Sequence, residues 1–484
     1  MTQKFSQPLF IILFLFFIFS AASCSDDENN GIAPESYTDT ALKMEIKGDH
    51  SFYTYEYPSI DADGNPITLS AALIAWTPTK NIADSQIESV VVLSHMTIFS
   101  NFECPTMYPS IRPDTDVMLL WEVVGRTGYK PLSHSIVIMP DYEGYGATVT
   151  RQHPYLAREV TARQVVDAMR YGLKYYQQLV EYGTNPPLKD NYNTFLTGFS
   201  QGAAVSLGTQ QYIEENGLSD EFHLKGSLIG DGPYDMLSTL HYYINDNGTS
   251  YGVNTIHRQN EVSMPMAMAL AIKGMIRSHP DMRNYHLTDF FTKSFIDTGI
   301  FQWIDDKVLD VDKQKKTTQI WHLLYDEAEN GHTAADGTVY SSEDMQQIIS
   351  THFINDRLIL NDQYRAHGNL QQMLVPEVYE YLASLTPSSP VPTDKGNPAH
   401  DLHRALYDNV IGRGWTPQHR IIFMHSKHDI VVPFCNYLSF AEAHPNADIR
   451  LEVFSKEDHV DAGKEYFIYL YTNGSTLFDW LAGK

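Results

Sequence analysis

The feature that constrains this chain most is a short apolar segment that runs directly into a serine flanked by two glycines. Thr194–Thr197 is apolar enough for a buried strand, and Gly198-Phe199-Ser200-Gln201-Gly202 follows it without a gap. Gln201–Glu215 then has helical character and ends at Asn216-Gly217, as helices often do. Gly-x-Ser-x-Gly between a strand and a helix forms a sharp turn at the carboxyl end of the strand. The sequence therefore predicts a strand–turn–helix unit here.

The same five-residue pattern occurs a second time, at Gly248-Thr249-Ser250-Tyr251-Gly252. That copy follows the polar stretch Asn245-Asp246-Asn247, where no strand is expected. Only the first copy has the context in which such a serine becomes an exposed nucleophile. We therefore predict that Ser200 is the nucleophile and that Ser250 is a loop serine.

Short apolar segments alternate with helix-forming segments through much of the chain. Strands are expected at Phe52–Tyr57, Ile67–Trp76, Val90–Leu93, Ser135–Met139, Lys225–Gly230, Arg420–Met424 and Ile449–Phe454, and a helix at Thr161–Tyr182. The first two strands are joined by turn residues and predict a hairpin. The alternation predicts an α/β fold with a mostly parallel central sheet and helices on both faces. Residues 49–236 form the first part of this core and residues 416–484 the second.

The alternation stops in residues 237–415, which we interpret as a large helical cap inserted into the core. Met264–Ile276 and Ser342–Arg357 have helical spacing. Met264, Met268 and Met275 could line an apolar entrance or, more commonly for methionine, fill an ordinary core. The sequence leaves both options open.

The amino terminus has the pattern of an export signal. Lys4 precedes an apolar run from Leu9 to Phe19, and small residues follow up to Cys24. This run is too short to span a bilayer as a helix, which takes about 20 residues, so residues 1–23 are predicted to be a signal peptide. Residues 24–48 are then expected to form a flexible tether.

The residues around Cys24 resemble a bacterial lipobox, in which the cysteine receives a diacylglyceryl group. Ser25-Asp26-Asp27-Glu28 resembles the acidic surface-export tag of Bacteroidetes lipoproteins. The resemblance implies a lipoprotein of the outer membrane or cell surface that meets the membrane only through its lipid anchor. A plain secreted protein is the alternative.

Composition excludes several other classes. With a net charge of −25, the chain would repel phosphate backbones, so nucleic acid is not an expected partner. Three cysteines are too few for a disulfide framework or a multi-cysteine metal site. Cys104 and Cys435 could pair or remain free. Tight histidine ligand pairs and nucleotide-binding glycine loops are lacking, so no metal or cofactor is expected.

A serine nucleophile needs a base and an acid that orients the base. In enzymes whose serine stands in such a Gly-x-Ser-x-Gly turn, the three follow in the order serine, acid, histidine. Asp429 follows the strand that ends at Met424, and His459 follows the next strand. Asp231, at the end of an earlier strand, is a rival acid. His444 is the other histidine after Asp429 but precedes a strand, which puts it at the wrong edge of the sheet. We predict a triad of Ser200, Asp429 and His459.

An oxyanion formed at Ser200 would need two backbone N–H groups. Gln201, directly after the nucleophile, supplies the first. The loop Ser94-His95-Met96-Thr97 leaves an early strand in the right place for the second. We predict Thr97, with Met96 as the alternative.

Taken together, these motifs resemble the α/β-hydrolase superfamily and, within it, the secretory lipases described from fungi and bacteria. The matching landmarks are Tyr57–Asp61 with Gly64-Asn65-Pro66 and Leu69-Ser70, then Pro140–Gly144, Gly198–Gly202, Asp429 with Val432-Pro433, and His459. They cover about residues 49–236 and 416–484. The chain departs from the group at Met96, where a glycine usually follows the histidine.

The resemblance implies a serine esterase or lipase that acts on a small-molecule ester without a metal. A peptidase with the same triad is one alternative, although the chain has too few residues before Val90 for the β-propeller that often precedes such enzymes. A lipoprotein that captures a ligand without catalysis is another.

Overall fold

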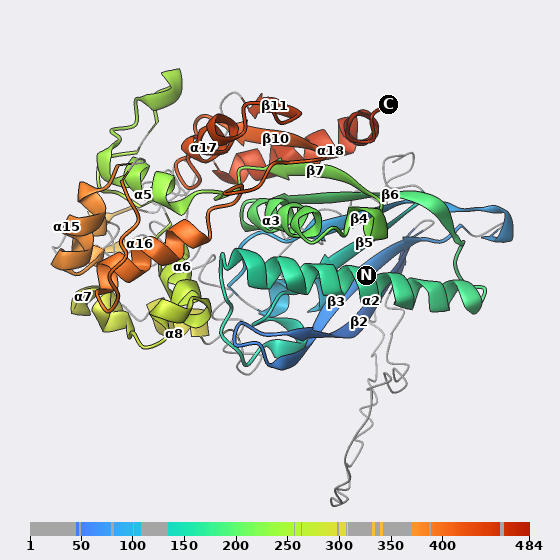
Figure 1. The fold of residues 1–484 in the computed structure, drawn as a ribbon, viewed down its shortest axis with the longest axis horizontal. Coiled ribbons are helices and arrows are strands. Elements are labelled where there is room, and N and C mark those ends of the chain that lie inside the picture. Colours follow the sequence, from blue (N-terminus) through green and yellow to red (C-terminus); the bar gives the residue numbers. More distant parts are fainter. Residues whose placement is uncertain are drawn as a thin grey trace, which may run out of the picture. The chain divides into compact units, whose positions relative to one another are not determined.

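A nine-stranded sheet forms the centre of the computed structural model, with strand order β1-β2-β3-β5-β4-β6-β7-β10-β11 (Figure 1). The structure describes residues 45–47, 50–78, 82–99, 101–107, 134–255, 257–262, 264–297, 300–305, 307, 332–333, 339–341, 369–386, 389–454 and 459–484. The predicted signal peptide, the lipid-attachment residue Cys24 and the helix predicted at Ser342–Arg357 lie outside these residues.

The strands are β1 (Glu45–Lys47), β2 (His50–Ile60), β3 (Pro66–Trp76), β4 (Ile87–Ser94), β5 (Ser135–Pro140), β6 (Leu188–Phe199), β7 (Leu224–Gly230), β10 (Arg420–Ser426) and β11 (Ile449–Phe454). The pairs β1–β2, β2–β3 and β3–β5 are antiparallel, and every pair from β5 to β11 is parallel. This confirms the predicted mostly parallel sheet with its opening hairpin. Strand β1 lies within the expected tether, so that prediction is wrong for residues 45–47, whose backbone pairs with β2.

Helices cover both faces of the sheet. On one face, α2 (Arg158–Glu181), α3 (Gln201–Glu215), α4 (Ser219–Phe222) and α17 (Cys435–Ala443) contribute to the packing, and on the other lies α18 (His459–Leu481). Alternate residues of β4 serve the two faces: Val90 and Val92 pack towards α2, whereas Val91 and Leu93 pack towards α18. Apolar side chains on both faces are why these strands read as continuous apolar runs.

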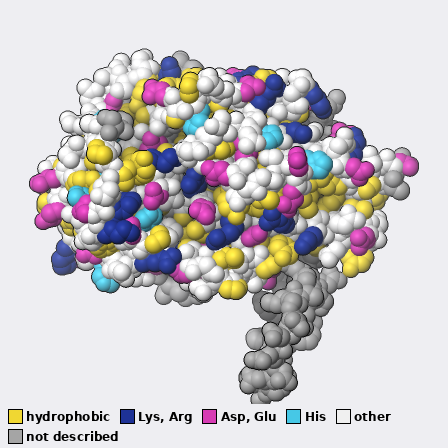
Figure 2. All heavy atoms as spheres, in the orientation of Figure 1, with side chains coloured by type: hydrophobic (Ala, Val, Ile, Leu, Met, Phe, Trp, Pro, Cys, Tyr) yellow, Lys and Arg dark blue, Asp and Glu magenta, His cyan; other side chains and the backbone are white. Residues whose placement is uncertain are grey.

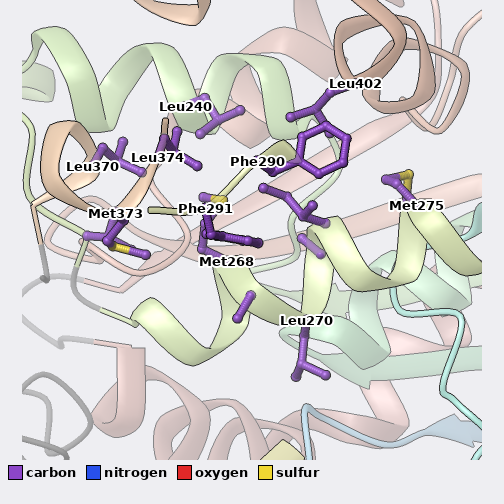
Figure 3. Packing of buried hydrophobic residues seen from close by; sticks show 14 of the residues in the cluster. Leu240, Met268, Leu270, Met275, Phe290, Phe291, Leu370, Met373, Leu374 and Leu402 are labelled. Carbon is purple, nitrogen blue, oxygen red and sulfur yellow. The ribbon is translucent and has the colours of Figure 1, made fainter. Parts of the chain in front are cut away.

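Between β7 and β10 the chain forms a group of helices at one end of the sheet (Figure 1). They are α5 (Met236–Asn245), α6 (Pro265–Ser278), α7 (Lys293–Ile296), α8 (Ile300–Asp305), α14 (Leu370–Met373), α15 (Pro376–Ser384) and α16 (Pro398–Asp408), with the two-residue strands β8 (His332–Thr333) and β9 (Val339–Tyr340). Methionine, leucine and phenylalanine side chains from these helices and their loops interlock in one buried cluster (Figure 3). The cluster also contains Phe99, Tyr155, Val431 and Val432, so the inserted helices share a core with the loops that follow β4, β5 and β10.

Short 3-10 turns complete the described elements: η1 (Ile82–Asp84), η2 (Asn101–Glu103), η3 (Pro105–Met107), η4 (Gly146–Thr148), η5 (Ser250–Gly252), η6 (Pro280–Met282) and η7 (Leu287–Asp289).

Cys104 and Cys435 are both free thiols, which decides against a disulfide between them. Within the described residues, no helix combines the length and apolar character that crossing a bilayer requires. Acidic and basic side chains are interspersed on the face shown in Figure 2.

Candidate active site

Ser200 occupies the tight turn between β6 and α3, with backbone angles φ 56° and ψ −124°. A positive φ is strained for serine and is held here by the surroundings. Its N–H donates to the Gly230 carbonyl at 2.8 Å. A Cβ atom on Gly202 would lie 2.0 Å from the Ser94 carbonyl oxygen, and one on Gly198 would lie 2.6 Å from the same atom. Both glycines are therefore required for the helix to start this close to β4.

The structure brings the three predicted triad residues into one hydrogen-bonded row. His459 Nε2 lies 2.9 Å from Ser200 Oγ, and His459 Nδ1 lies 2.5 Å from Asp429 Oδ2. All three residues are buried, and Ser200 is the most exposed of them at 8%. This is the geometry in which an imidazole can take a proton from a serine while a carboxylate fixes its tautomer.

His459 is placed by the helix that it begins. Further along α18, the Tyr466 hydroxyl accepts the Gly198 N–H at 3.1 Å and donates to the Leu228 carbonyl at 3.0 Å. The Phe199 ring lies 5.0 Å from the His459 ring. Helix α18 is thereby fastened to the strand that carries the nucleophile.

Asp429 is oriented by its own loop. Its Oδ1 accepts the N–H groups of Val431 and Val432, each at 2.8 Å, which leaves Oδ2 for His459. His425 Nε2 lies 2.9 Å from the Val432 carbonyl oxygen and ties this loop to the end of β10. The carboxylate is thus fixed before any substrate binds.

The rival residues have other partners. Asp231 Oδ1 accepts the Ser426 N–H at 2.8 Å and lies 3.3 Å from His425 Nε2. His444 Nδ1 faces the Phe440 carbonyl in α17, and its Nε2 faces the carbonyls of Gly412 and Trp415, which precede β10. Ser250 lies in the turn η5 and donates to the Asp246 carboxylate.

Among the described residues, Asp231, His425 and Asp429 have potential metal-ligand atoms within 4.8 Å of one another. However, His425 Nε2 and both Asp429 oxygens already make the hydrogen bonds described above.

The buried histidines of this region should make stability depend on pH. Burial lowers the pKa of His425 to about 4. The His425 imidazole is protonated below pH 6.5 in the unfolded chain but only near pH 4 in the folded chain. Its contribution to the free energy of unfolding is therefore complete above pH 6.5 and is lost as the pH falls towards 4. In His425→Gln, the amide nitrogen can still donate to Val432 without titrating. We expect wild type to lose about 2 to 3 kcal/mol more free energy of unfolding than this variant between pH 7.5 and 4.5, measured by urea denaturation. Equal losses of free energy of unfolding in wild type and His425→Gln would contradict the lowered pKa of His425.

The predicted oxyanion residues lie beside Ser200. Gln201 is the first residue of α3, where backbone N–H groups have no partner inside the helix. Thr97 lines the same cavity as Ser200, whereas Met96 packs against the apolar cluster beneath α18. The side chains of these residues reveal two neighbours that the sequence had not indicated. The Gln201 amide nitrogen lies 2.7 Å from His153 Nε2, and Thr97 Oγ1 lies 2.8 Å from the Tyr155 hydroxyl.

The loop that carries Met96 and Thr97 is supported from below by His95. The ring of His95 stacks on Tyr142, and its nitrogens lie 2.7 Å from the Met96 carbonyl oxygen and 3.1 Å from that of Asp141. Complete burial lowers the pKa of His95 to about 4 and outweighs the effect of the two carbonyls. The residue is therefore neutral at ordinary pH, and its ring lies against the Met96 carbonyl.

A cavity opens at Ser200. Its wall is mainly apolar and includes the predicted cap residues Met264 and Met268. A second apolar cavity, lined in part by Met275, shares the wall residues Leu156, Pro233 and Met236 with the first. The three methionines thus both pack in the core and line cavities.

Sheet order, the strained serine turn and the serine–histidine–aspartate row together define the α/β-hydrolase fold. Solved structures agree. The rice cell wall degrading esterase LipA from Xanthomonas oryzae matches with a TM-score of 0.57 and 18% identity, over 89% of this chain and 91% of that chain. A candidate hydrolase from Legionella pneumophila matches with a TM-score of 0.56 and 16% identity, over 90% and 91%. No protein-family model and no curated protein sequence matches the chain.

Proposed function

We propose that this protein is a serine esterase or lipase that hydrolyses carboxylic esters through an acyl-enzyme. The observation that carries the proposal is the row of hydrogen bonds from Asp429 through His459 to Ser200, with Ser200 in the wall of a largely apolar cavity. The fold shared with LipA, which is described as an esterase, supports it.

In this mechanism His459 Nε2 takes the proton of Ser200 while Oγ attacks the ester carbonyl carbon. The backbone N–H groups of Gln201 and Thr97 hold the developing oxyanion. His459 then gives its proton to the leaving alcohol, and a water molecule, activated by the same imidazole, releases the acid from the acyl-enzyme. Asp429 stabilises the imidazolium formed in each step.

The shape and lining of the cavity favour an ester with an apolar acyl group. Tyr155, Met264 and Met268 offer surface that gains from burying methylene groups, at about 0.8 kcal/mol each. Leu156, Pro233 and Met236 line both this cavity and the next, and so form the wall between them. The first cavity would limit the acyl chain, and the second provides room beyond it.

A ladder of p-nitrophenyl esters from acetyl to palmitoyl tests the proposal, together with a fluorophosphonate probe that labels active serine hydrolases. We expect hydrolysis and labelling at Ser200. Cleavage of peptide amides but not of esters would favour the peptidase. Binding of apolar ligands without hydrolysis or labelling would favour the ligand-capturing lipoprotein.

Removing the wall between the cavities should lengthen the preferred substrate. In Met236→Ala, the two cavities join, and we expect kcat/KM for palmitoyl relative to butyryl esters to rise about tenfold, the gain from burying about two more methylenes. Met266→Ala is the matched control, because Met266 belongs to the same buried cluster but lines neither cavity. An equal change in both variants would show that the wall does not limit chain length.

We also propose that the protein is exported and anchored by a lipid on Cys24, as the amino-terminal pattern predicts. In cells of a bacterium that acylates lipoproteins, an alkyne fatty acid should label wild type and leave Cys24→Ala unlabelled. Label in neither protein would favour the secreted alternative, and label in both would show that the lipid is not on Cys24.

A further inference from the structure

The loop residues Gln152–Tyr155, here called the 152–155 segment, lie between the inserted helices and the proposed oxyanion site. One side of the segment contacts α6. On its other side, His153 and Tyr155 reach Gln201 and Thr97, the two residues proposed to hold the oxyanion. One short segment therefore touches both of them.

His153 holds the Gln201 side chain through a defined tautomer. Nδ1 lies 2.7 Å from the Glu143 carbonyl oxygen, which can only accept, so Nδ1 carries the hydrogen. Nε2 is then the acceptor for the Gln201 amide at 2.7 Å. His153 is only 3% exposed, and burial holds its pKa well below its usual range, so this neutral form persists.

Tyr155 holds Thr97 in the same manner. Its hydroxyl lies 2.8 Å from Thr97 Oγ1, and burial raises the pKa of Tyr155 to about 12, so the hydroxyl keeps its hydrogen. This hydrogen bond selects one χ1 rotamer of Thr97 and ties the residue to the 152–155 segment. It therefore restrains the loop whose backbone carries a proposed oxyanion donor.

Helix α6 backs the segment from the other side. The Gln152 amide donates to the Lys273 carbonyl at 2.7 Å, and a Cβ atom on Gly274 would lie 2.2 Å from the Tyr155 carbonyl oxygen. Arg277 binds Glu143, whose carbonyl accepts from His153, at 3.0 Å. The segment is thus confined between α6 and the start of α3.

We propose that His153 and Tyr155 are positioning residues that align the Gln201 and Thr97 N–H groups with the oxyanion. The inference rests on the proposed ester hydrolysis and adds to it the residues that set the alignment. The Tyr155 ring also lines the cavity, but neither its hydroxyl nor the His153 side chain has to touch the reacting atoms. Their effect should therefore appear in transition-state binding and leave substrate binding nearly unchanged.

Isosteric variants separate the two contacts. Tyr155→Phe removes only the hydroxyl. In His153→Asn, the amide replaces Nδ1 and keeps Glu143 but loses Gln201; in His153→Gln, the side-chain oxygen replaces Nε2 and keeps Gln201. Tyr176→Phe is the control, because Tyr176 is equally buried and donates to the Pro186 carbonyl at 2.7 Å, far from the site in the fold.

We expect Tyr155→Phe and His153→Asn each to lower kcat on p-nitrophenyl butyrate about tenfold, less than the loss of a whole oxyanion donor, with KM changed less than twofold. The inhibition constant of a trifluoromethyl ketone, whose adduct carries an oxyanion, should rise in parallel. His153→Gln should keep most of the activity. In a Thr97→Val background, Tyr155→Phe should cost nothing further, because the two residues act as one unit.

Equal kcat and inhibition constants in Tyr155→Phe, His153→Asn and Tyr176→Phe would overturn the inference. So would a full additional loss from Tyr155→Phe in the Thr97→Val background. Failure of the proposed function looks different: wild type itself would neither hydrolyse esters nor bind the ketone, and that result would remove the inference with it.

Discussion

A Ser200→Ala variant is expected to hydrolyse p-nitrophenyl butyrate with a kcat about a millionfold below that of wild type, the scale seen when a triad serine is removed. The variant keeps the cavity and the oxyanion N–H groups but has no atom to form the acyl-enzyme. Steady-state kinetics with highly purified enzyme measures this loss. Labelling by a fluorophosphonate should disappear together with activity.

Ser250→Ala is the matched control for this prediction. Ser250 stands in an identical Gly-x-Ser-x-Gly pattern but lies in the turn η5, bonded to Asp246. We expect this variant to keep wild-type kcat and labelling. Activity that survives in Ser200→Ala and vanishes in Ser250→Ala would reverse the assignment.

The second large effect is expected at the acid of the triad. Asp429→Asn should lower kcat about ten-thousandfold. The asparagine amide can keep the shape of the site, but it no longer holds His459 in the tautomer that accepts the serine proton, nor stabilises the imidazolium. The folded structure should persist, because the change is isosteric, and circular dichroism with thermal unfolding checks this.

Asp231→Asn serves as the comparison, since Asp231 is also a buried aspartate at the end of a neighbouring strand. Asp231 accepts a hydrogen bond from the Ser426 N–H and lies beside His425. We therefore expect Asp231→Asn to shift the adjacent loop slightly and to lower kcat less than about tenfold. A larger loss in Asp231→Asn than in Asp429→Asn would make Asp231 the acid that orients His459.

Local chemistry explains which parts of this molecule could be predicted from sequence. The turn at Ser200 follows from a strand, two glycines and a helix that are adjacent in the chain, and α3 has the predicted bounds, Gln201–Glu215. The parallel strands could be predicted from their apolar runs, because both faces of the sheet are buried. The pairing of Asp429 with His459 followed from the order of strands, since the carboxyl ends of parallel strands meet at one edge.

The residues that refine the site could not be predicted in this way. His153 meets Gln201 across 48 positions of sequence, and Tyr155 meets Thr97 across 58. Both stand in a loop without periodicity or motif, so their role depends on how α6 packs against that loop. The strand β1 was missed for a related reason, because three residues of edge strand carry too little pattern to stand out from a polar leader.

Distance along the chain has a consequence for the timing of activity. Ser200 and His459 are separated by 259 positions, and the whole inserted group of helices lies between them. At about 5 to 20 residues per second, a ribosome needs roughly 13 to 50 seconds to pass from one to the other. During that interval the nascent chain carries the serine turn without its base. A serine–histidine–aspartate row of this design is therefore incomplete while the chain is being made, and it can form only after the last helix has joined the sheet.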